Sequence, residues 1–340
     1  MVSKADFKIT SSINKEKWNE FVYSNPRGNI FQTIEMAEVY SKTKRMESLR
    51  LAAVDENDNI QAVLVAYISK EKSGLLEPFA SRAVILGGPI FLDTKKGINA
   101  MVQLIEYYDT ITKKKAIFSE IRVIHKTPQF KLLENVGYVY EDHLNYLVDL
   151  TRPKDELWNR LSKSRRRFIR NARKKGVIVE EMKDCNTLPV FYDLLSETYK
   201  NARIPLADIS LFKSAFDLLV PKNMLKIFLA RYKEEYIGGI MVPLYKGTIY
   251  EWYVCGSRNH PNLYPSEVVT WHPIEWGAEN GFHTFDFGGA GRPDQEYGVR
   301  YFKSQFGGKL VNFGRYRQIY SPLRMKIAMC GFKIYQKLLC

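Results

Sequence analysis

The residues best suited to chemistry lie within one stretch of the chain, Glu279–Gly308. His283–Phe287 alternates as a short strand does, and the glycine-rich segment Gly288–Gly291 that follows it predicts a turn with exposed backbone. Phe302 and Lys303 come next, just before a second pair of glycines. We expect the strand to end in the glycines and the chain to return through this pair, which places one ammonium group beside an aromatic wall. Such a group stabilises negative charge that develops on a reacting oxygen.

Plainer interpretations of the same residues stay open. A bend of two glycines flanked by aromatic residues is commonly loop and core, and a single lysine is commonly a solvated surface group. Asp286 is either a general base or the residue that fixes the turn through side-chain to backbone bonds. Gly288–Gly291 has neither the spacing nor the Lys-Ser/Thr pair of a nucleotide phosphate loop. No Ser-His-Asp or Cys-His pattern is evident, which agrees with acyl transfer by direct attack.

The second chemical feature is a run of eight cations, with no acid among them, within residues 163–175. The surrounding segment, Leu157–Lys175, is predicted to be one helix with a thin apolar stripe. Like charges four residues apart repel by ~0.2–0.5 kcal/mol per pair unless an anion neutralises them. We therefore expect the helix to bind the phosphate backbone of RNA; a solvated helix face is the alternative. The residues predicted to contact tRNA are Arg166, Arg170, Arg173 and Lys174.

An α/β framework must position these residues. The first half of the chain begins with short helices and a hairpin and continues as alternating helices and strands. The second half repeats this outline, and it includes the predicted strands Ile249–Cys255 and Leu310–Tyr320. The repetition predicts two α/β domains of related fold with mixed sheets. We expect the first domain to comprise residues 1–150 completed by 315–340, and the second to comprise residues 151–314.

Length and composition fit two domains. The chain has 340 residues, of which 45% are hydrophobic and 13% aromatic, enough for two buried cores. The four cysteines have no paired short spacing and the histidines do not lie at ligand spacing, so we expect a reducing compartment and no metal site. No apolar window reaches the ~18 residues of a membrane span, which predicts a cytoplasmic protein. The net charge of +14 indicates anionic partners.

Motifs spread over nearly the whole chain resemble those of a known family. In order, they are Phe31–Thr33, Ala83–Asp93 with its Gly-Gly-Pro, Arg170–Gly176, Tyr253–Ser257, Phe285–Gly289 and Phe302–Gly308. In this order and spacing they resemble the FemABX family of peptidoglycan-bridge aminoacyltransferases and the acetyltransferase-like domains related to it. The resemblance implies two tandem GNAT-like domains without a coiled-coil arm, with the C-terminal helix packing back on the first.

The resemblance also implies an activity. It is the transfer of an amino acid from aminoacyl-tRNA to an amine of a cell-wall precursor peptide that is nucleotide- or lipid-linked, with no further cofactor and with a monomeric enzyme. By position, Lys303 resembles the residue that contacts the reacting carbonyl, with Phe302 as its neighbour. The residues expected to bind substrate are Gln32, Arg203, Tyr253 and Asp286. Pairing with a helix dipole is an alternative role for Arg203, and core packing is one for Tyr253.

The sequence departs from the family in two places that bear on the acceptor. Met36, Glu38 and Tyr40 stand where a tryptophan and a basic residue often follow the Gln-Ser/Thr pair, and Ile121–Val123 contains no acid. Two other functions stay open: an acyl-CoA-dependent N-acyltransferase of the same fold, and a non-catalytic RNA-binding protein. Neither half carries the Gln/Arg-x-x-Gly-x-Gly/Ala turn that binds the coenzyme A pyrophosphate at a helix start, which favours tRNA.

The C-terminal segment Leu323–Leu339 is predicted to be an amphipathic basic helix. Such a helix either docks on the first domain or contacts an acidic membrane surface, which is where a lipid-linked acceptor would lie. Its modest charge favours docking.

Overall fold

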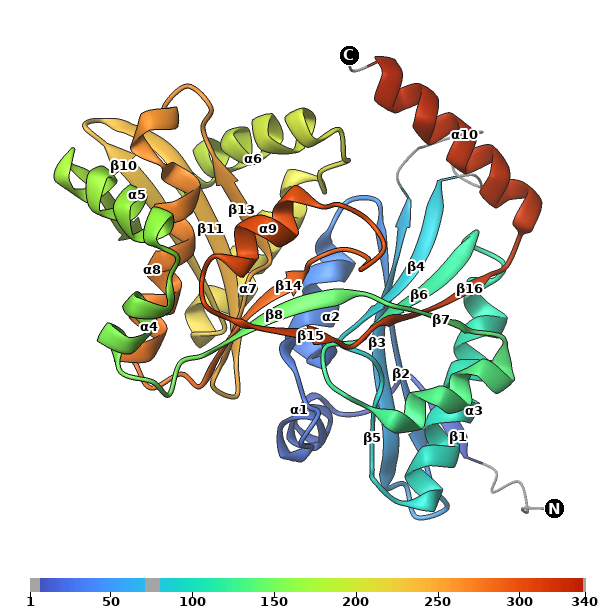
Figure 1. Cartoon of the computed structure of the whole chain (residues 1–340). Helices are drawn as coiled ribbons and strands as arrows, with labels where there is room; N and C mark the ends of the chain where they lie inside the picture. Colours follow the sequence, from blue (N-terminus) through green and yellow to red (C-terminus); the bar gives the residue numbers. More distant parts are fainter. Residues whose placement is uncertain (1–6, 71–79, 339–340) are drawn as a thin grey trace. The chain divides into compact units, whose positions relative to one another are not determined.

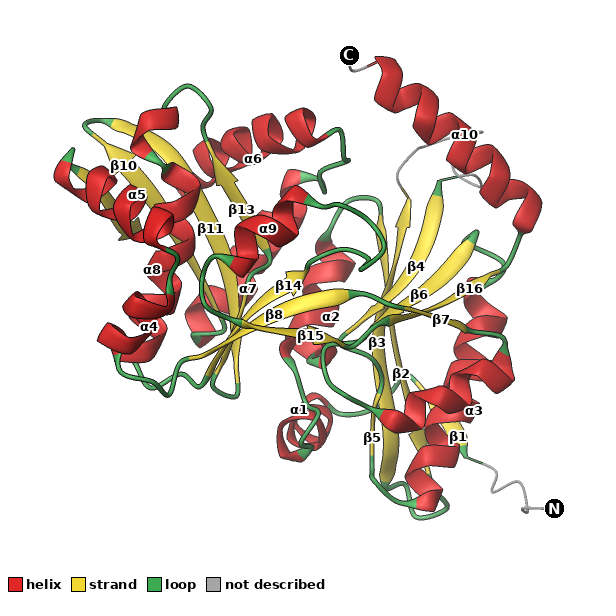
Figure 2. Ribbon diagram, viewed as in Figure 1, coloured by secondary structure: helices red, strands yellow, loops and turns green. Residues whose placement is uncertain are grey.

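The computed structural model describes residues 7–70 and 80–338, and it describes side chains as far as Gly331. The chain divides into two compact units (Figure 1). Unit 1 is Met1–Asp142 together with Phe313–Cys340, and unit 2 is His143–Asn312. In each unit helices pack against a mixed sheet (Figure 2).

Unit 1 is built on a sheet in the order β1-β2-β3-β4-β6-β16-β7, with β5 paired to β3. Strands β4 and β6 run parallel. The strands are β1 (Lys8–Thr10), β2 (Met46–Val54), β3 (Ile60–Lys70), β4 (Ser81–Leu86), β5 (Ile90–Phe91), β6 (Phe118–Arg122), β7 (Val139–Glu141) and β16 (Arg315–Ile319). The helices are α1 (Lys15–Ser24), α2 (Ile34–Lys42), α3 (Lys95–Thr112) and α10 (Pro322–Leu338), with 3-10 turns at Ile30–Gln32 and Pro128–Val136.

Helix α3 covers one face of this sheet. Thr94 caps its N-terminus, where the threonine hydroxyl accepts a bond from the Gly97 amide at 3.0 Å. Met101, Leu104 and Ile105 recur at helical spacing, and all three are fully buried in the core of unit 1. The apolar stripe of α3 therefore covers one face of the sheet, and the alternation of β6 places Glu120 and Arg122 on the opposite face.

The C-terminal segment completes unit 1 through β16, which pairs antiparallel with both β6 and β7. The helix that follows, α10, is largely exposed in its described part: the exposed fractions are 70% for Leu323, 48% for Ile327 and 52% for Met329. Met325 and Ala328 are half-buried. The predicted last residue of this helix, Leu339, lies outside the described residues.

Unit 2 is a sheet in the order β15-β8-β14-β12-β11-β10-β9, with β13 paired to β11. Its strands are β8 (Leu144–Asp149), β9 (Val177–Glu181), β10 (Leu225–Tyr232), β11 (Glu235–Tyr245), β12 (Thr248–Tyr250), β13 (Tyr253–Gly256), β14 (Thr284–Gly289) and β15 (Lys309–Asn312). Its helices are α4 (Lys154–Arg160), α5 (Lys163–Lys174), α6 (Leu188–Ala202), α7 (Ile209–Leu219), α8 (Pro265–Glu279) and α9 (Gly298–Ser304).

The predicted strand Ile249–Cys255 is broken into β12 and β13. β12 pairs parallel with β14 from Thr248 to Tyr250, whereas β13 pairs with β11. Between them, the Glu251 amide still bonds to the carbonyl of Asp286, at 2.8 Å, and the Trp252 amide turns to the carbonyl of Met241. The chain therefore leaves β14 at Glu251, and this point of divergence carries the candidate site.

Three further expectations were wrong in detail. The basic segment is two helices, α4 and α5. Leu161 ends α4, and the Ser162 hydroxyl caps α5 by accepting a bond from the Arg165 amide at 3.3 Å. Phe302 and Lys303 lie on a helix, α9, and not on a returning strand. The predicted strand Leu310–Tyr320 is interrupted at Gly314, whose φ of 73° suits glycine, so that β15 and β16 belong to different sheets.

The division between the units also lies earlier than residue 150. The predicted first domain includes the strand Tyr146–Asp149, but β8 pairs with β14 and β15 of unit 2. The alternation of β8 suits either sheet, so only the pairing decides its place.

Candidate functional site

Lys303 is buried against the end of β14. Its side chain is 8% exposed. Its Nζ donates to the carbonyl of Phe287 and, at 3.1 Å, to that of Gly289; the carboxylate Oε1 of Glu251 lies 3.0 Å away. An ammonium group has three hydrogens, so these three acceptors account for all of them. A reacting oxygen can bond to Lys303 only by taking the place of one acceptor.

Glu251 is the acidic member of this pair. Its side chain is 5% exposed, and its Oε2 is buried without a hydrogen-bond partner among the described residues. Burial raises the pKa of Glu251 above its usual value, and the neighbouring Lys303 opposes this effect. The site therefore holds a carboxylate that is costly to ionise next to a single cation.

Asp286 lies beside the pair on β14 and is also buried. Its Oδ1 accepts bonds from the Asn145 side-chain amide and from the Gly288 amide, both at 2.7 Å. Burial raises the pKa of Asp286, and these two bonds oppose the rise. The bond to Gly288, whose φ is 68°, is the turn-fixing contact that the sequence allows as an alternative to a base.

Aromatic residues line the same part of unit 2. Tyr253 opens β13, and its ring lies 4.6 Å from that of Phe212 and 6.0 Å from that of Tyr199, centroid to centroid. Burial raises the pKa of Tyr199, and the charge of Glu251 raises it further, so the two groups lie within electrostatic reach. Arg203 is different: it ends α6 in a left-handed conformation, φ 56°, and is exposed.

Phe302 connects α9 to the basic helix. The Arg165 guanidinium of α5 lies over the Phe302 ring, 4.6 Å from its centroid, and also pairs with the Glu267 carboxylate of α8. Phe302 in turn packs against Phe306, with ring centroids 5.1 Å apart. One cation of the basic run is therefore a structural link, and Phe302 is part of the wall that holds α9 in place.

Some of the other cations of α5 make contacts within unit 2, and others lie on its exposed face. Arg166 donates to the carbonyl of Asn159 at 2.6 Å, and Arg173 pairs with Glu275 at 2.5 Å. Arg170 lies over the Trp158 ring, 5.3 Å from its centroid. The exposed cations of this helix are Lys163, Arg167, Arg170, Arg173 and Lys174. Of the predicted tRNA contacts, Arg170, Arg173 and Lys174 are exposed, whereas Arg166 is half-buried. Arg173 is the one of these three exposed residues that the described structure pairs with a carboxylate.

Gln32 has a structural setting in unit 1. It is fully buried, and its side-chain amide donates to the carbonyls of Val65 and Leu86 at 3.0 and 2.8 Å. Its Oε1 accepts from the Val65 amide at 2.7 Å. These bonds tie the turn Ile30–Gln32 to β3 and β4, and they leave no exposed surface for a substrate.

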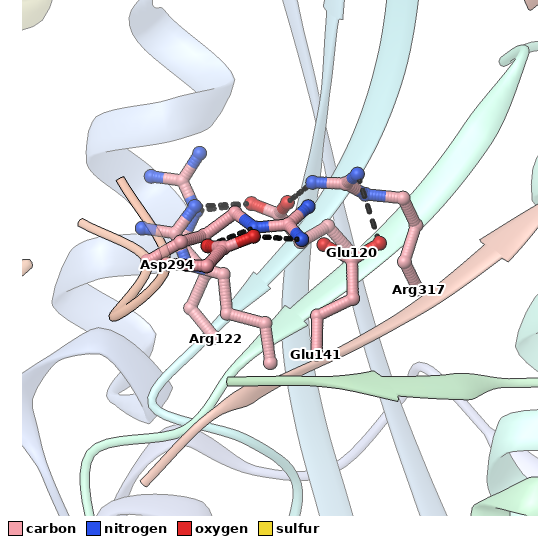
Figure 3. Close-up of polar contacts among 7 residues, drawn as sticks. Glu120, Arg122, Glu141, Asp294 and Arg317 are labelled. Carbon is pink, nitrogen blue, oxygen red and sulfur yellow. Dashed lines mark hydrogen bonds and ion pairs between the residues drawn. The ribbon is translucent and has the colours of Figure 1, made fainter. Parts of the chain in front are cut away.

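Unit 1 holds a second buried carboxylate, Glu120 on β6, within a group of arginines (Figure 3). Oε1 accepts from Arg122 at 2.7 Å and Arg315 at 3.3 Å, and Oε2 accepts from Arg317 at 2.7 Å. Arg317 also bonds to Glu141 on β7, at 3.1 Å. Burial, the largest single influence, raises the pKa of Glu120, but the three guanidinium groups together lower it well below its usual value.

The sequence interpretation missed Glu251, Asn145 and the arginines around Glu120. Glu251 stands among aromatic residues, between Tyr250 and Trp252. An acid inside an apolar strand indicates a buried, paired carboxylate. The sequence interpretation missed this signal because it predicted one continuous strand through Glu251. The pairing of Asn145 with Asp286, 141 residues apart, carries no local signal.

No group of three or more His, Cys, Asp or Glu side chains among the described residues could hold a metal ion. No helix within that part of the chain is long and apolar enough to cross a membrane.

The geometry of unit 2 agrees with comparisons with known proteins. Residues 159–303 match the family model described as an acetyltransferase (GNAT) domain. A lipid II:glycine glycyltransferase of Staphylococcus aureus (strain MRSA252) is 23% identical over 235 residues, which is 64% of this chain. The match spans 54% of that relative's length.

Solved structures extend the likeness to nearly the whole chain. The crystal structure of FemX has a TM-score of 0.69 at 20% identity and covers 94% of this chain and 100% of its own. A tandem GNAT protein from the clavulanic acid biosynthesis pathway has a TM-score of 0.58 at 8% identity and covers 93% of this chain and 99% of its own. The predicted fold class, two α/β GNAT-like domains with mixed sheets, is confirmed. The chain therefore has a tandem GNAT-like fold, and it resembles the FemABX family in sequence and in fold.

Proposed function

We propose that this protein is an aminoacyl-tRNA-dependent N-aminoacyltransferase that forms an amide on an amine of a cell-wall precursor peptide. The observation that carries the proposal is the buried Lys303 ammonium at the point where β12 and β14 diverge in a GNAT-type unit. The similarity to a lipid II:glycine glycyltransferase supports the choice of reaction and acceptor. The chain covers about half of that relative, so the acceptor is part of the proposal.

The reaction needs no covalent enzyme intermediate. The acceptor nitrogen forms a bond to the carbonyl carbon of the aminoacyl ester, and the carbonyl electron pair moves onto oxygen. When this pair returns, the bond from carbon to the ribose oxygen breaks, and the nitrogen's proton ends on that oxygen. The ester is already activated, so we propose that aminoacyl-tRNA is the co-substrate and that no other cofactor is used.

Lys303 supplies the charge that stabilises the tetrahedral oxyanion. All three of its hydrogens have acceptors in this structure, so the oxyanion replaces one of them, and we assign the exchange to the Gly289 carbonyl. That contact, at 3.1 Å, is longer than the one to Glu251, and it involves a neutral acceptor in a glycine turn. Glu251 keeps the ammonium in position during the exchange.

The exposed face of α5 is the proposed contact for the tRNA backbone. Reversal to glutamate at Lys163, Arg167 and Lys174 avoids the structural contacts of Arg165, Arg166 and Arg173. We expect weaker tRNA binding at low salt and a shallower salt dependence, since each phosphate contact contributes about 0.7–0.9 to the slope. The matched control reverses three exposed lysines of unit 1, Lys42, Lys114 and Lys131. An equal loss of tRNA affinity in both triple variants would show that net charge, and not a specific site on α5, determines binding.

The second candidate is acyl-CoA-dependent N-acylation, which the match to an acetyltransferase domain model favours. Helix α8 begins at Pro265 after Tyr264 in a left-handed conformation, and no glycine lies between Gly256 and that start. Proline lacks an N–H, so this helix start offers fewer donors to a pyrophosphate. This favours the aminoacyl ester as donor.

The α10 helix is the proposed peripheral contact with an acidic membrane. Leu323 and Ile327 are exposed one turn apart, and Arg324 and Lys326 flank them. We propose that the enzyme is monomeric and works at the cytoplasmic side of a membrane. Vesicles of anionic or neutral lipid, sedimented with wild type or Leu323→Glu/Ile327→Glu, test the contact. Unchanged sedimentation of the variant with anionic vesicles would overturn it.

One experiment tests the proposed function. Purified protein is incubated with tRNA carrying a labelled amino acid, or with labelled acetyl-CoA, and with a panel of nucleotide- and lipid-linked precursor peptides. We expect label to move from aminoacyl-tRNA onto a peptide amine. Transfer only from acetyl-CoA would establish the second candidate. Equal binding of charged and uncharged tRNA without transfer to any amine would indicate an RNA-binding protein.

A further inference from the structure

Glu251 has one carboxylate oxygen to which the described structure brings no donor. Its Oε1 lies 3.0 Å from Nζ of Lys303, whereas its Oε2 is buried without a hydrogen-bond partner among the described residues. Leaving a buried carboxylate oxygen without a donor costs free energy, and in folded proteins such an atom commonly marks a bound water or a catalytic role. Oε2 is therefore the position at which this site is incomplete.

The backbone fixes where this oxygen lies. The Glu251 amide donates to the carbonyl of Asp286 at 2.8 Å, at the point where β12 and β14 diverge. The glycine turn lies against the same residue, since a Cβ added at Gly288 would come within 3.3 Å of the Glu251 carbonyl oxygen. This turn also presents the Gly289 carbonyl to Lys303, at 3.1 Å. The exchange at Gly289 that frees a hydrogen of Lys303 therefore moves backbone next to Glu251.

Ionisable groups on three elements lie within electrostatic reach of Glu251: Lys303 on α9, Asp286 on β14 and Tyr199 on α6. Burial raises the pKa of Glu251, Lys303 opposes the rise, and the charge of Asp286 adds to it. Burial also raises the pKa of Tyr199, and the charge of Glu251 adds to that rise, so this phenol keeps its proton at neutral pH. A carboxylate whose pKa is moved up toward neutrality is suited to accept a proton from a substrate.

Asp286 is the other carboxylate here, and it is less suited to this role. Its Oδ1 accepts from the Asn145 side-chain amide and from the Gly288 amide, both at 2.7 Å. These charge-assisted bonds hold the glycine turn, and protonation of Asp286 would weaken both of them. Glu251 can take up a proton at Oε2 without losing a bond there.

We propose that Glu251 is the general base of the transfer, and that its Oε2 takes a proton from the acceptor amine. The inference rests on the proposed function, in which the acceptor is an amine. A primary alkyl amine has a pKa of about 10, so it arrives at neutral pH as an ammonium, which cannot attack. The ammonium supplies the donor that Oε2 lacks, and the loss of its proton makes it a nucleophile.

The protons balance in two steps. Glu251 accepts the first proton, and the electron pair freed on nitrogen forms the bond to the carbonyl carbon. The second proton leaves the nitrogen after attack and ends on the ribose oxygen when the bond from carbon to that oxygen breaks. Glu251 releases the first proton to water when the products leave, which restores the carboxylate.

Proton transfer to Glu251 also changes the charge beside Lys303. A neutral carboxyl group still accepts a bond through Oε1, but it no longer neutralises the ammonium. The charge of Lys303 is therefore less compensated at the moment when the oxyanion forms, and its pull on that oxygen is stronger. The acidic member of the pair activates the nucleophile, and the basic member stabilises the charge that results.

Two acceptors of different basicity test the assignment. One is the acceptor peptide that the panel of precursor peptides identifies; the other is the same peptide with an aminooxy group, which is neutral at pH 7, in place of the reacting amine. Glu251→Gln should slow single-turnover transfer to the amine at pH 7 by about 10²–10⁴, the usual contribution of a general base. It should slow transfer to the aminooxy peptide less than about tenfold, because that nucleophile needs no base before attack.

The pH dependence gives a second measurement. Wild-type rates with the amine should level off above the pKa of Glu251. Rates of Glu251→Gln should keep rising by about tenfold per pH unit, because the variant depends on amine that is already deprotonated. The deficit of the variant therefore shrinks as the pH rises. A purely structural loss would be the same at every pH and with both acceptors.

The matched control is Glu234→Gln, which removes an exposed carboxylate in the β10–β11 turn of the same unit and should behave like wild type. Glu251→Asp keeps a carboxylate but withdraws it by one methylene, so it should show a smaller difference between the two acceptors; it serves if the glutamine variant does not fold. Equal losses with both acceptors, or a deficit that is constant with pH, would overturn the inference while the proposed function stands. Wild type that transfers label to no peptide would refute the proposed function, and this inference with it.

Discussion

Glu120 in unit 1 and Glu251 in unit 2 are both buried carboxylates, yet their pKa values are shifted in opposite directions. Glu120 has three guanidinium partners, which lower its pKa well below the usual value. Glu251 has one ammonium partner, and its pKa is raised. Burial raises the pKa of both groups, but three cations oppose it at Glu120 and one opposes it at Glu251, so we attribute the opposite net shifts to the number of paired cations.

The difference also separates structure from chemistry. The Glu120 group joins β6, β16 and β7 and leaves neither carboxylate oxygen unpaired. At Glu251, one oxygen has no partner among the described residues, and the charge of Lys303 is balanced by a single weakly acidic group. A saturated network holds a sheet together, whereas an incompletely satisfied pair can change partners during a reaction.

The largest effect on stability is expected at Glu120. Glu120→Gln removes the charge that holds three arginines together, and breaking a buried ion pair from one side costs about 3–5 kcal/mol. Urea unfolding followed by circular dichroism measures the loss. Glu141→Gln is the control, because Glu141 is 28% exposed and forms its ion pair with Arg317 alone of the three arginines. A loss below about 1 kcal/mol for Glu120→Gln would mean that the arginines are held by other contacts.

The largest effect on activity is expected at Lys303. Lys303→Met keeps the stem of the side chain and removes the charge, so transfer should fall by about 10²–10³, or roughly 3–4 kcal/mol. Lys303→Arg should rescue it poorly, because a planar guanidinium places its charge differently. Single-turnover rates with saturating aminoacyl-tRNA measure the chemical step. Retention of more than about a third of the wild-type rate would remove Lys303 from the mechanism.

Asp109 extends the comparison to a buried carboxylate whose bonded partners are the hydroxyls of Tyr138 and Tyr320. Burial raises its pKa from 3.8 to about 6, and the two hydroxyl bonds oppose the rise. Because the folded state binds the proton more tightly, stability should fall as the pH rises from about 4 to 6. With ~1.4 kcal/mol per tenfold change in proton affinity, the loss approaches about 3 kcal/mol.

The test at Asp109 is a pH series of unfolding free energies. Asp109→Asn keeps an oxygen acceptor. Its unfolding free energy should vary less with pH than that of wild type between pH 4 and 6, and it should be more stable than wild type at pH 7. Parallel pH profiles for the two proteins would show that burial does not control this carboxyl group.

The smallest expected effect isolates the Lys303–Glu251 pair itself. Lys303→Met leaves Glu251 buried without a cation, and its raised pKa makes this variant relatively more stable as the pH falls toward 5. Adding Glu251→Gln should raise the free energy of unfolding by about 1–2 kcal/mol at pH 7, since an uncharged amide costs less to bury. It should not restore activity. A double variant less stable than Lys303→Met at pH 7 would contradict the account of Glu251.

The sequence alone determined the elements whose signals are local. Asn14 stands before an apolar stripe and caps α1, and Gly288–Gly291, at the end of β14, form the predicted turn. The repeated order of elements predicted two related α/β domains, and the resemblance carried by the motifs implied that their fold is GNAT-like. The candidate residues around Lys303 came from the same local patterns, and their roles stay predictions.

Tertiary structure decided what depends on pairing between distant segments. Whether β8 belongs to the first or the second sheet follows from its partners β14 and β15, since its own alternation fits both. Glu251 contacts Lys303 only because α9 folds back on β14, although the two residues are 52 positions apart in the sequence. Burial of a charge and the identity of its partner are properties of the packed chain, and for this reason no local pattern predicts that Glu120 is saturated and Glu251 is not.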